Sequence, residues 1–133
     1  MNKMKFISKS LIDTLVYFYY KLYFKIKNTK QLNTWLISER GIDARDNGYW
    51  FYKYIKENHP EIDVKYIISK DCADYNKIDK DDVVEYRSKE HYKYFIYSKY
   101  LISAEIMGFS PNEQLYYRLN KYGILKVKGK QIF

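Results

Sequence analysis

The sequence predicts an α/β fold in which the strands of a parallel sheet alternate with helices, as in Rossmann-like domains. Short apolar runs typical of buried strands recur along the chain, and stretches with apolar residues at helical spacing separate them. A connection crowded with charged residues, 38–48, joins the first such strand to the first such helix. Ligands of parallel sheets bind outside the carboxyl ends of the strands. This connection is therefore the best candidate for a functional site.

The first half of the predicted domain begins at Thr34 and contains three strands and one helix. The apolar run Trp35–Ile37 is the first strand. A helix is expected from about Asn47 to Asn58, because the apolar residues 50, 51, 54 and 55 fall on one helical face. His59 ends this helix, since the residue before a proline avoids the α region. The remaining elements are strands at 64–68 and 83–86, and an irregular turn around 74–78.

The second half of the domain is predicted to contain two helices and two strands. Ser88 is expected to cap a helix reaching about Lys99, with inward-facing Tyr92, Phe95, Ile96 and the stem of Lys99. Ser110, Pro111 and Glu113 predict a second helix start, with the serine as its cap, and Gly123 ends that helix. Its inward face is expected to carry Leu115, Leu119 and Tyr122. The strands are expected at 100–104 and 128–133. Because a domain rarely ends where a strand has just begun, we expect a longer protein.

The first 28 residues predict one helix, because they contain no glycine or proline. Its longest uncharged run, Thr14–Tyr20, has seven residues, far fewer than the ~20 needed to span a bilayer. Lysines spaced four apart border its aromatic-rich apolar surface. This pattern predicts a basic amphipathic segment, residues 1–30, that lies on an anionic membrane surface. The alternative is a helix packed on the domain 34–133, or on a second copy of the chain, with solvated lysines.

The positive charge is concentrated at the two ends of the chain. Residues 1–33 carry seven lysines against Asp13, whereas residues 34–112 carry twelve basic and fourteen acidic residues. A nucleic-acid-binding domain usually carries its charge on the folded face that grips the phosphates, so we expect no nucleic-acid partner. The single cysteine excludes an intramolecular disulfide, and with only two histidines it predicts no metal site. His59 is expected at a helix end and His91 in an exposed, solvated helical position.

The candidate site consists of polar residues that lead into the first helix of the domain. Free backbone N–H groups at a helix start attract phosphate, and an arginine adds a bidentate fork. The candidate phosphate- or acceptor-binding residues are Glu39, Arg40, Arg45, Asp46, Asn47 and Gly48, together with Glu105, which follows the strand 100–104.

A purely structural role is the alternative for each of these residues. Asp46 or Asn47 would then cap the helix, and Arg45 would pair with Glu39 or Asp43. Glu105 would be a carboxylate at the edge of a loop. The sequence contains no G-x-G-x-x-G motif, no P-loop and no G-x-S-x-G motif, so none of these motifs supports nucleotide binding or hydrolase chemistry.

Several segments resemble the CDP-glycerol glycerophosphotransferases that polymerise teichoic acids. The resemblance is most specific at Trp35–Arg40, Ala44–Tyr49 and Lys53–Ile62. It continues through 66–68, 74–75, 83–86 and 99–103. Residues 128–133 resemble the strand that leads to a Gln-His-Gly segment in that family. The similarity covers about 34–133.

The resemblance implies a GT-B architecture of two Rossmann-like domains, of which this chain is the N-terminal, acceptor-side half. The family's proposed base is a histidine that would follow Phe133, so no catalytic residue is expected in this chain. The nucleotide site lies in the second domain, and no cofactor or metal is implied. The chain departs from the family pattern at Gly41, commonly proline, and at Ala104-Glu105, often Ser-His. Because related capsule polymerases use other polyol phosphates, these departures leave the donor and acceptor variants open.

The function implied is transfer of glycerol phosphate from CDP-glycerol to a growing teichoic acid or capsule-like polymer. The expected partners are CDP-glycerol through the missing second domain, the polyol-phosphate acceptor, and the cytoplasmic face of a bacterial plasma membrane. A homo-oligomer is also compatible with the sequence. The chain alone is expected to be inactive. The alternative is a non-catalytic membrane-surface or assembly module that retains only the acceptor-binding half.

Overall fold

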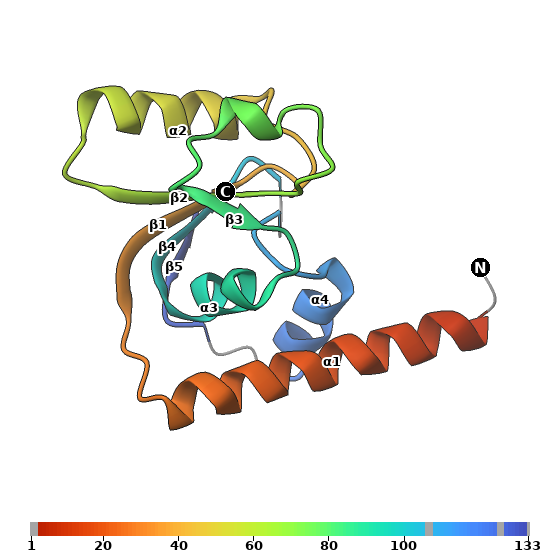
Figure 1. Ribbon diagram of the computed structural model, residues 1–133. Coiled ribbons are helices and arrows are strands. Elements are labelled where there is room, and N and C mark those ends of the chain that lie inside the picture. Colours follow the sequence, from red (N-terminus) through yellow and green to blue (C-terminus); the bar gives the residue numbers. More distant parts are fainter. Residues whose placement is uncertain (1–2, 106–107, 125–126, 133) are drawn as a thin grey trace.

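The computed structural model describes residues 3–105, 108–124 and 127–132 of the 133-residue chain. Within these residues, five strands form one parallel sheet in the order β3-β2-β1-β4-β5 (Figure 1). The strands are β1 (Leu32–Ser38), β2 (Asp63–Ile68), β3 (Val83–Glu85), β4 (Ser98–Ser103) and β5 (Lys130–Ile132). The predicted α/β fold class with a parallel sheet is therefore confirmed.

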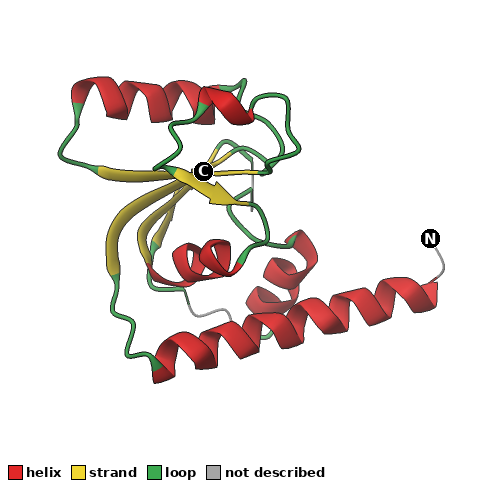
Figure 2. Ribbon diagram, in the orientation of Figure 1, coloured by secondary structure: helices red, strands yellow, loops and turns green. Residues whose placement is uncertain are grey.

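Helices cover both faces of the sheet (Figure 2). One face carries α2 (Asn47–Asn58) and the short 3-10 helix η1 (Tyr75–Lys77), and the other carries α1 (Lys3–Ile26), α3 (Lys89–Tyr97) and α4 (Glu113–Lys121). The chain runs outward from β1 to β3, then crosses back to β4 on the other side of β1. Connections between parallel strands are right-handed, so the helices that lead to strands on one side of β1 lie on one face of the sheet, and those that lead to strands on its other side lie on the opposite face. The direction in which successive strands are added reverses between β1 and β4.

Alternation along β1 sends neighbouring side chains into two separate cores. Leu36 packs in the core beneath α1, α3 and α4, with Phe95 and Leu101 among its fully buried members. Ile37 packs in the core beneath α2, with Tyr52 and Tyr66. The sequence predicted β1 as a buried strand, and it is buried on both faces.

The boundaries of α2 agree with the prediction. Asp46 is the N-cap, and its side chain accepts a hydrogen bond from Asn47 N at 3.1 Å. His59 is the C-cap, and its backbone N–H donates to Ile55 O at 2.8 Å. Both signals are local in sequence, which explains why they could be read correctly.

The start of α4 was predicted wrongly. Asn112, rather than Ser110, is the N-cap, and its Oδ1 accepts from Gln114 N at 2.9 Å and Leu115 N at 3.0 Å. Ser110 instead donates through its hydroxyl to Asn112 O at 2.9 Å. Asparagine caps helices as well as serine does, and Pro111 then precedes the helix. Gly123, at φ +64°, follows the end of α4 as predicted.

Two other side chains lie differently from the prediction. Tyr122 is exposed, and Tyr116 takes its expected place among the buried residues of α4. The helix α3 ends at Tyr97, so Lys99 lies in β4 with its side chain exposed. Ser88 caps α3 as predicted, accepting from His91 N at 3.1 Å.

His91 was predicted to be solvated and is fully buried. Its Nδ1 accepts from Arg87 N at 2.9 Å, so Nε2 carries the proton and donates to Phe109 O at 2.9 Å. Burial lowers the pKa of His91 to about 4, opposed by the Phe109 hydrogen bond. The neutral ring therefore joins the turn before α3 to the loop after β4.

The segment 3–26 forms the single helix predicted for the N-terminal region, and it packs on α3 and α4. Tyr17 is fully buried, and the Tyr20 ring lies 4.9 Å from the Tyr92 ring between centroids. Arg118 of α4 donates to Ser10 O at 3.3 Å. These contacts match the alternative of a helix packed on the domain. Among the described residues, no helix is both long enough and apolar enough to cross a membrane.

Candidate functional site

The carboxylate of Glu39 is held inside the loop between β1 and α2. Its Oε1 accepts from Asp46 N at 2.8 Å and Tyr49 N at 3.0 Å, and its Oε2 accepts from Arg45 N at 3.2 Å. Only 3% of Glu39 is exposed. Because backbone N–H groups at a helix N-terminus bind anions, this carboxylate occupies the position that the sequence suggested for a phosphate.

Two glycines make room for this arrangement. A Cβ on Gly48 would lie 2.9 Å from Cγ of Glu39, and a Cβ on Gly108 would lie 1.9 Å from the Glu39 carbonyl oxygen. Real Cβ atoms do not approach so closely, so both positions require glycine. Gly48 was a candidate from the sequence. The role of Gly108 was missed, because it is a contact between segments far apart in the chain.

Arg45 pairs with a partner that the sequence did not indicate. Its Nε donates to Oδ2 of Asp74 at 2.5 Å, in place of the side-chain pairing with Glu39 or Asp43 that the structural alternative proposed. Asp74 also contacts Lys77 Nζ at 2.8 Å. Hydrogen bonds from Lys77 and then from Arg45 hold the pKa of Asp74 well below its usual range. The Arg45 side chain is still 66% exposed, so part of its guanidinium faces solvent.

Arg40 and Glu105 meet from the ends of two neighbouring strands. Arg40 forms an ion pair with Asp43, and its Nη1 lies 3.7 Å from Glu105 Oε1. The hydroxyl of Ser103, at the end of β4, donates to Glu39 O and accepts from Glu105 N, each at 3.2 Å. Arg40 and Glu105 are each about half exposed.

All seven predicted site residues therefore gather where β1 and β4 end. This is the point at which the strand order reverses, and doubly wound sheets bind ligands in the crevice there. The structure separates six of the seven by role. Glu39 and Gly48 are buried in the loop and Asp46 caps α2, whereas Arg40, Arg45 and Glu105 present charge to solvent.

A pocket of about 410 Å³ lies beside this loop. Asn47 and Gly48 line one side, and Ser103 and Ala104 line another. Its remaining wall is apolar and consists of Trp35, Phe51, Ile102 and Ile132. The Trp35 and Phe51 rings are stacked with centroids 6.4 Å apart. From the sequence, Trp35 was expected to be buried in a strand and Phe51 on the apolar face of a helix. That both line one pocket depends on how α2 crosses the sheet, which the sequence does not show.

The comparisons with known proteins identify the family. Residues 18–123 match the family described as CDP-glycerol:poly(glycerophosphate) glycerophosphotransferase. The chain belongs to this family. The match begins within α1, so it extends further toward the N-terminus than the resemblance that began near Thr34.

One relative is the minor teichoic acid biosynthesis protein GgaB of Bacillus subtilis strain 168. The two chains are 31% identical over 117 residues, which cover 84% of this chain but 12% of GgaB. This member of the glycerophosphotransferase family thus spans about an eighth of the length of the relative it matches. No solved structure gave a significant match.

Proposed function

We propose that this chain is the N-terminal, acceptor-side part of a GT-B polyol-phosphate transferase. It would help to move glycerol phosphate from CDP-glycerol to a growing teichoic acid or capsule-like polymer. The family match over residues 18–123 carries this proposal. The similarity to GgaB, a teichoic acid biosynthesis protein, supports the same pathway.

The reaction requires more than this chain. An acceptor hydroxyl oxygen bonds to the phosphorus of the glycerol phosphate, the bond from that phosphorus to the CMP oxygen breaks, and the hydroxyl proton passes to a base. We assign the base to a histidine after Phe133 and the nucleotide site to a second domain. Residues 1–133 then contribute one wall of the cleft and have no turnover alone.

Within that wall, the exposed arginines are the groups suited to the acceptor. Glu39 already accepts from the N–H groups of Asp46 and Tyr49 at the α2 start, so a phosphate would approach from outside the loop. There it meets the solvent-facing parts of Arg40 and Arg45, each able to donate charge-assisted hydrogen bonds. The adjacent apolar pocket suits the carbon skeleton of a polyol or sugar.

CMP release from CDP-glycerol tests this assignment. Residues 1–133 should release no CMP with a polyol-phosphate primer, whereas the same chain joined to the C-terminal remainder of a full-length relative should do so. Turnover by residues 1–133 alone would show that the chain carries its own catalytic centre. Absence of turnover in a folded, joined protein would favour the second candidate, a non-catalytic membrane-surface or assembly module.

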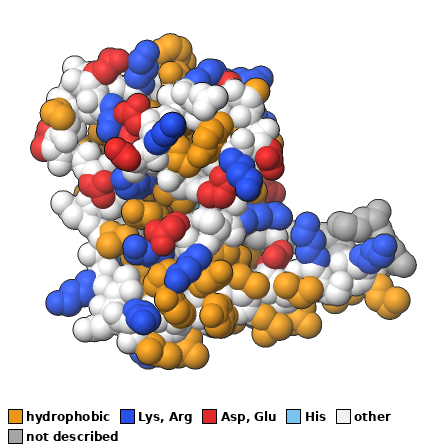
Figure 3. All heavy atoms as spheres, in the orientation of Figure 1, with side chains coloured by type: hydrophobic (Ala, Val, Ile, Leu, Met, Phe, Trp, Pro, Cys, Tyr) orange, Lys and Arg blue, Asp and Glu red, His pale blue; other side chains and the backbone are white. Residues whose placement is uncertain are grey.

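We further propose that α1 attaches the protein to the cytoplasmic face of the plasma membrane. Exposed apolar residues three or four apart form an outward stripe along the whole helix: Met4, Ile7, Leu11, Leu15, Phe18, Leu22 and Ile26. Figure 3 shows hydrophobic side chains gathered along this edge of the molecule. At 1.5 Å per residue the 24-residue helix is about 36 Å long. Lysines flank the stripe on both sides, which suits an interface rich in anionic lipid.

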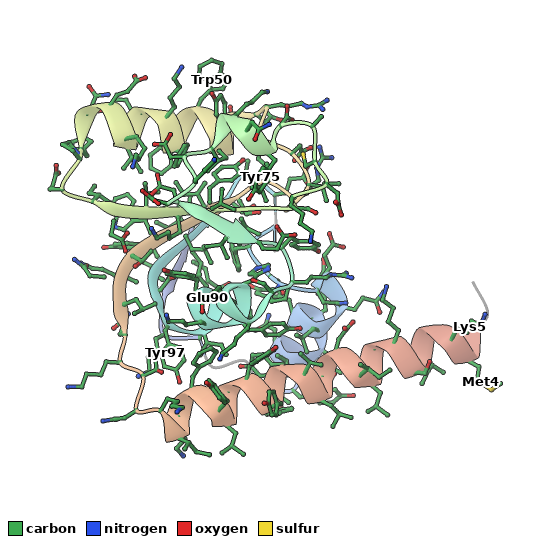
Figure 4. All side chains as sticks on the ribbon, in the orientation of Figure 1. Met4, Lys5, Trp50, Tyr75, Glu90 and Tyr97 are labelled. Carbon is green, nitrogen blue, oxygen red and sulfur yellow. The ribbon has the colours of Figure 1, made fainter. Side chains whose placement is uncertain are left out.

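Leu15→Glu tests this attachment, because Leu15 is exposed and contributes little to the core. The variant should lose binding to phosphatidylglycerol-containing vesicles, and binding of the unaltered chain should weaken at high salt. Trp50→Glu is the matched control, since Trp50 is also exposed but points away from the sheet on α2 (Figure 4). Equal losses in the two variants would contradict a role for the stripe.

A further inference from the structure

A groove of about 390 Å³ lies at the C-terminal end of α1, away from the candidate site. Ile96, Tyr97 and Val127 supply its apolar wall. Figure 4 shows Tyr97 beside that end of α1. The next residue, Ser98, begins β4, so the groove lies at the opposite end of β4 from Ser103 and the loop 38–48.

Three lysines line this groove, and the stretches of chain that line it carry no acidic residue. Lys21 and Lys25 come from α1, and Lys128 comes from the segment just before β5. The stretches 14–38, 91–104 and 114–133 contain no Asp or Glu. Among the described residues, the ion pairs include neither Lys25 nor Lys128. The lining of the groove therefore contains three lysines and no acidic residue.

The partial negative charge of a helix C-terminus explains only part of this cluster. It favours lysines in the last turn, such as Lys25. It does not explain Lys128, which comes from a different segment. The backbone of Lys128 is fixed at the groove by two hydrogen bonds, from its own N to Ile96 O at 2.8 Å and from Gln31 Nε2 to its O at 3.1 Å. A third lysine is thus positioned opposite the other two.

The groove opens at the border of the outward stripe. At about 100° per residue, Lys21 and Lys25 lie roughly 60° around α1 from Phe18 and Leu22. A ligand held by these lysines would therefore sit beside the apolar surface of α1. Long lysine stems can lie along apolar surface while the ammonium groups contact an anion.

We propose that this groove binds the phosphate of an anionic glycerophospholipid. The phosphate contacts Lys25 and Lys128, and the glycerol and the first acyl carbons lie against Ile96, Tyr97 and Val127. The proposal rests on the membrane attachment proposed above, because the stripe is what brings a lipid headgroup to the groove. The position of the lysines beside the stripe favours a lipid over a soluble polyanion.

Titration with short-chain, water-soluble dihexanoyl phosphatidylglycerol tests the groove without a membrane. Lys25→Gln combined with Lys128→Gln should weaken binding about tenfold or more, since each lysine donates a charge-assisted hydrogen bond. Lys5→Gln combined with Lys9→Gln removes the same charge from the other flank of α1 and should change binding less than about twofold. NMR shifts should cluster at Ile96, Tyr97 and Val127.

The outcomes separate the groove from the attachment. Equal weakening in the two double variants would overturn the proposed lipid site in the groove. Lysines would then attract lipid by charge alone, without a defined binding site. Normal vesicle binding with no saturable binding of the soluble lipid would overturn the groove while sparing the attachment by α1. Saturation of the same residues by soluble poly(glycerol phosphate), at lower phosphate concentration than the lipid, would overturn the lipid assignment in favour of the polymer.

Discussion

Removing the Glu39 carboxylate is expected to destabilise the fold severely. Glu39→Ala leaves the N–H groups of Arg45, Asp46 and Tyr49 without the acceptor they now share. Each unsatisfied buried donor costs about 1–3 kcal/mol, and partial access of water to the loop reduces the sum. We expect a loss of about 3–5 kcal/mol, a large part of the 5–15 kcal/mol typical of a domain.

Urea unfolding of residues 1–133 measures this loss, and Glu39→Gln provides a graded comparison. The amide keeps one acceptor oxygen but no charge, so it should lose about half as much. The alanine variant also vacates an anion position at the start of α2, so added phosphate should restore part of the stability. A loss below about 1 kcal/mol for Glu39→Ala would refute the structural role and return Glu39 to the acceptor site.

Further predictions concern the arginine, the buried histidine and the glycine contact. In residues 1–133 joined to the C-terminal remainder of a full-length relative, Arg45→Ala should lower turnover about 10- to 100-fold while the melting temperature changes little. An equal effect of Asp74→Asn would mean that Arg45 acts only through that pair. His91, with a pKa of about 4, binds its proton more weakly in the folded chain than in the unfolded chain. Stability should therefore be almost fully present above about pH 7 and fall by about 2 kcal/mol between pH 7 and 5 in urea titrations, and His91→Gln should remove this slope. Gly108→Ala should be destabilising by at least 2 kcal/mol or so in the same assay, because its Cβ would collide with the Glu39 carbonyl, and a neutral result would show that the loop after β4 can move aside.

The sequence predicted those features of the fold that depend on neighbouring residues. Strand β1 and helix α2 could be placed because an apolar run, a capping residue and a proline mark their limits locally. The start of α4 was misplaced because Ser110 and Asn112 are both good caps, and only the path of the chain decides between them.

For the site, the sequence predicted which residues gather at one edge of the sheet but not which residues they contact. The seven candidates were correctly expected at the ends of two strands, because parallel strands bring their carboxyl ends to one edge. Their partners could not be read from the sequence. Asp74 reaches Arg45 from the connection after β2, and Phe109 buries His91 from the loop after β4. Such contacts depend on tertiary packing, on which the local pattern carries no information.

The packing of α1 has a consequence for the geometry of the proposed transfer reaction. Because Tyr17 and Phe24 of this helix belong to the core, α1 cannot swing away from the domain without opening it. If α1 is the membrane anchor proposed above, a helix that is also a core element fixes the tilt of the whole domain relative to the membrane surface. The ends of β1 and β4 would then stand at a constant height and angle above the lipid. A membrane-tethered acceptor would have to bring its growing end to that height, so its tether length would determine which chains can be extended.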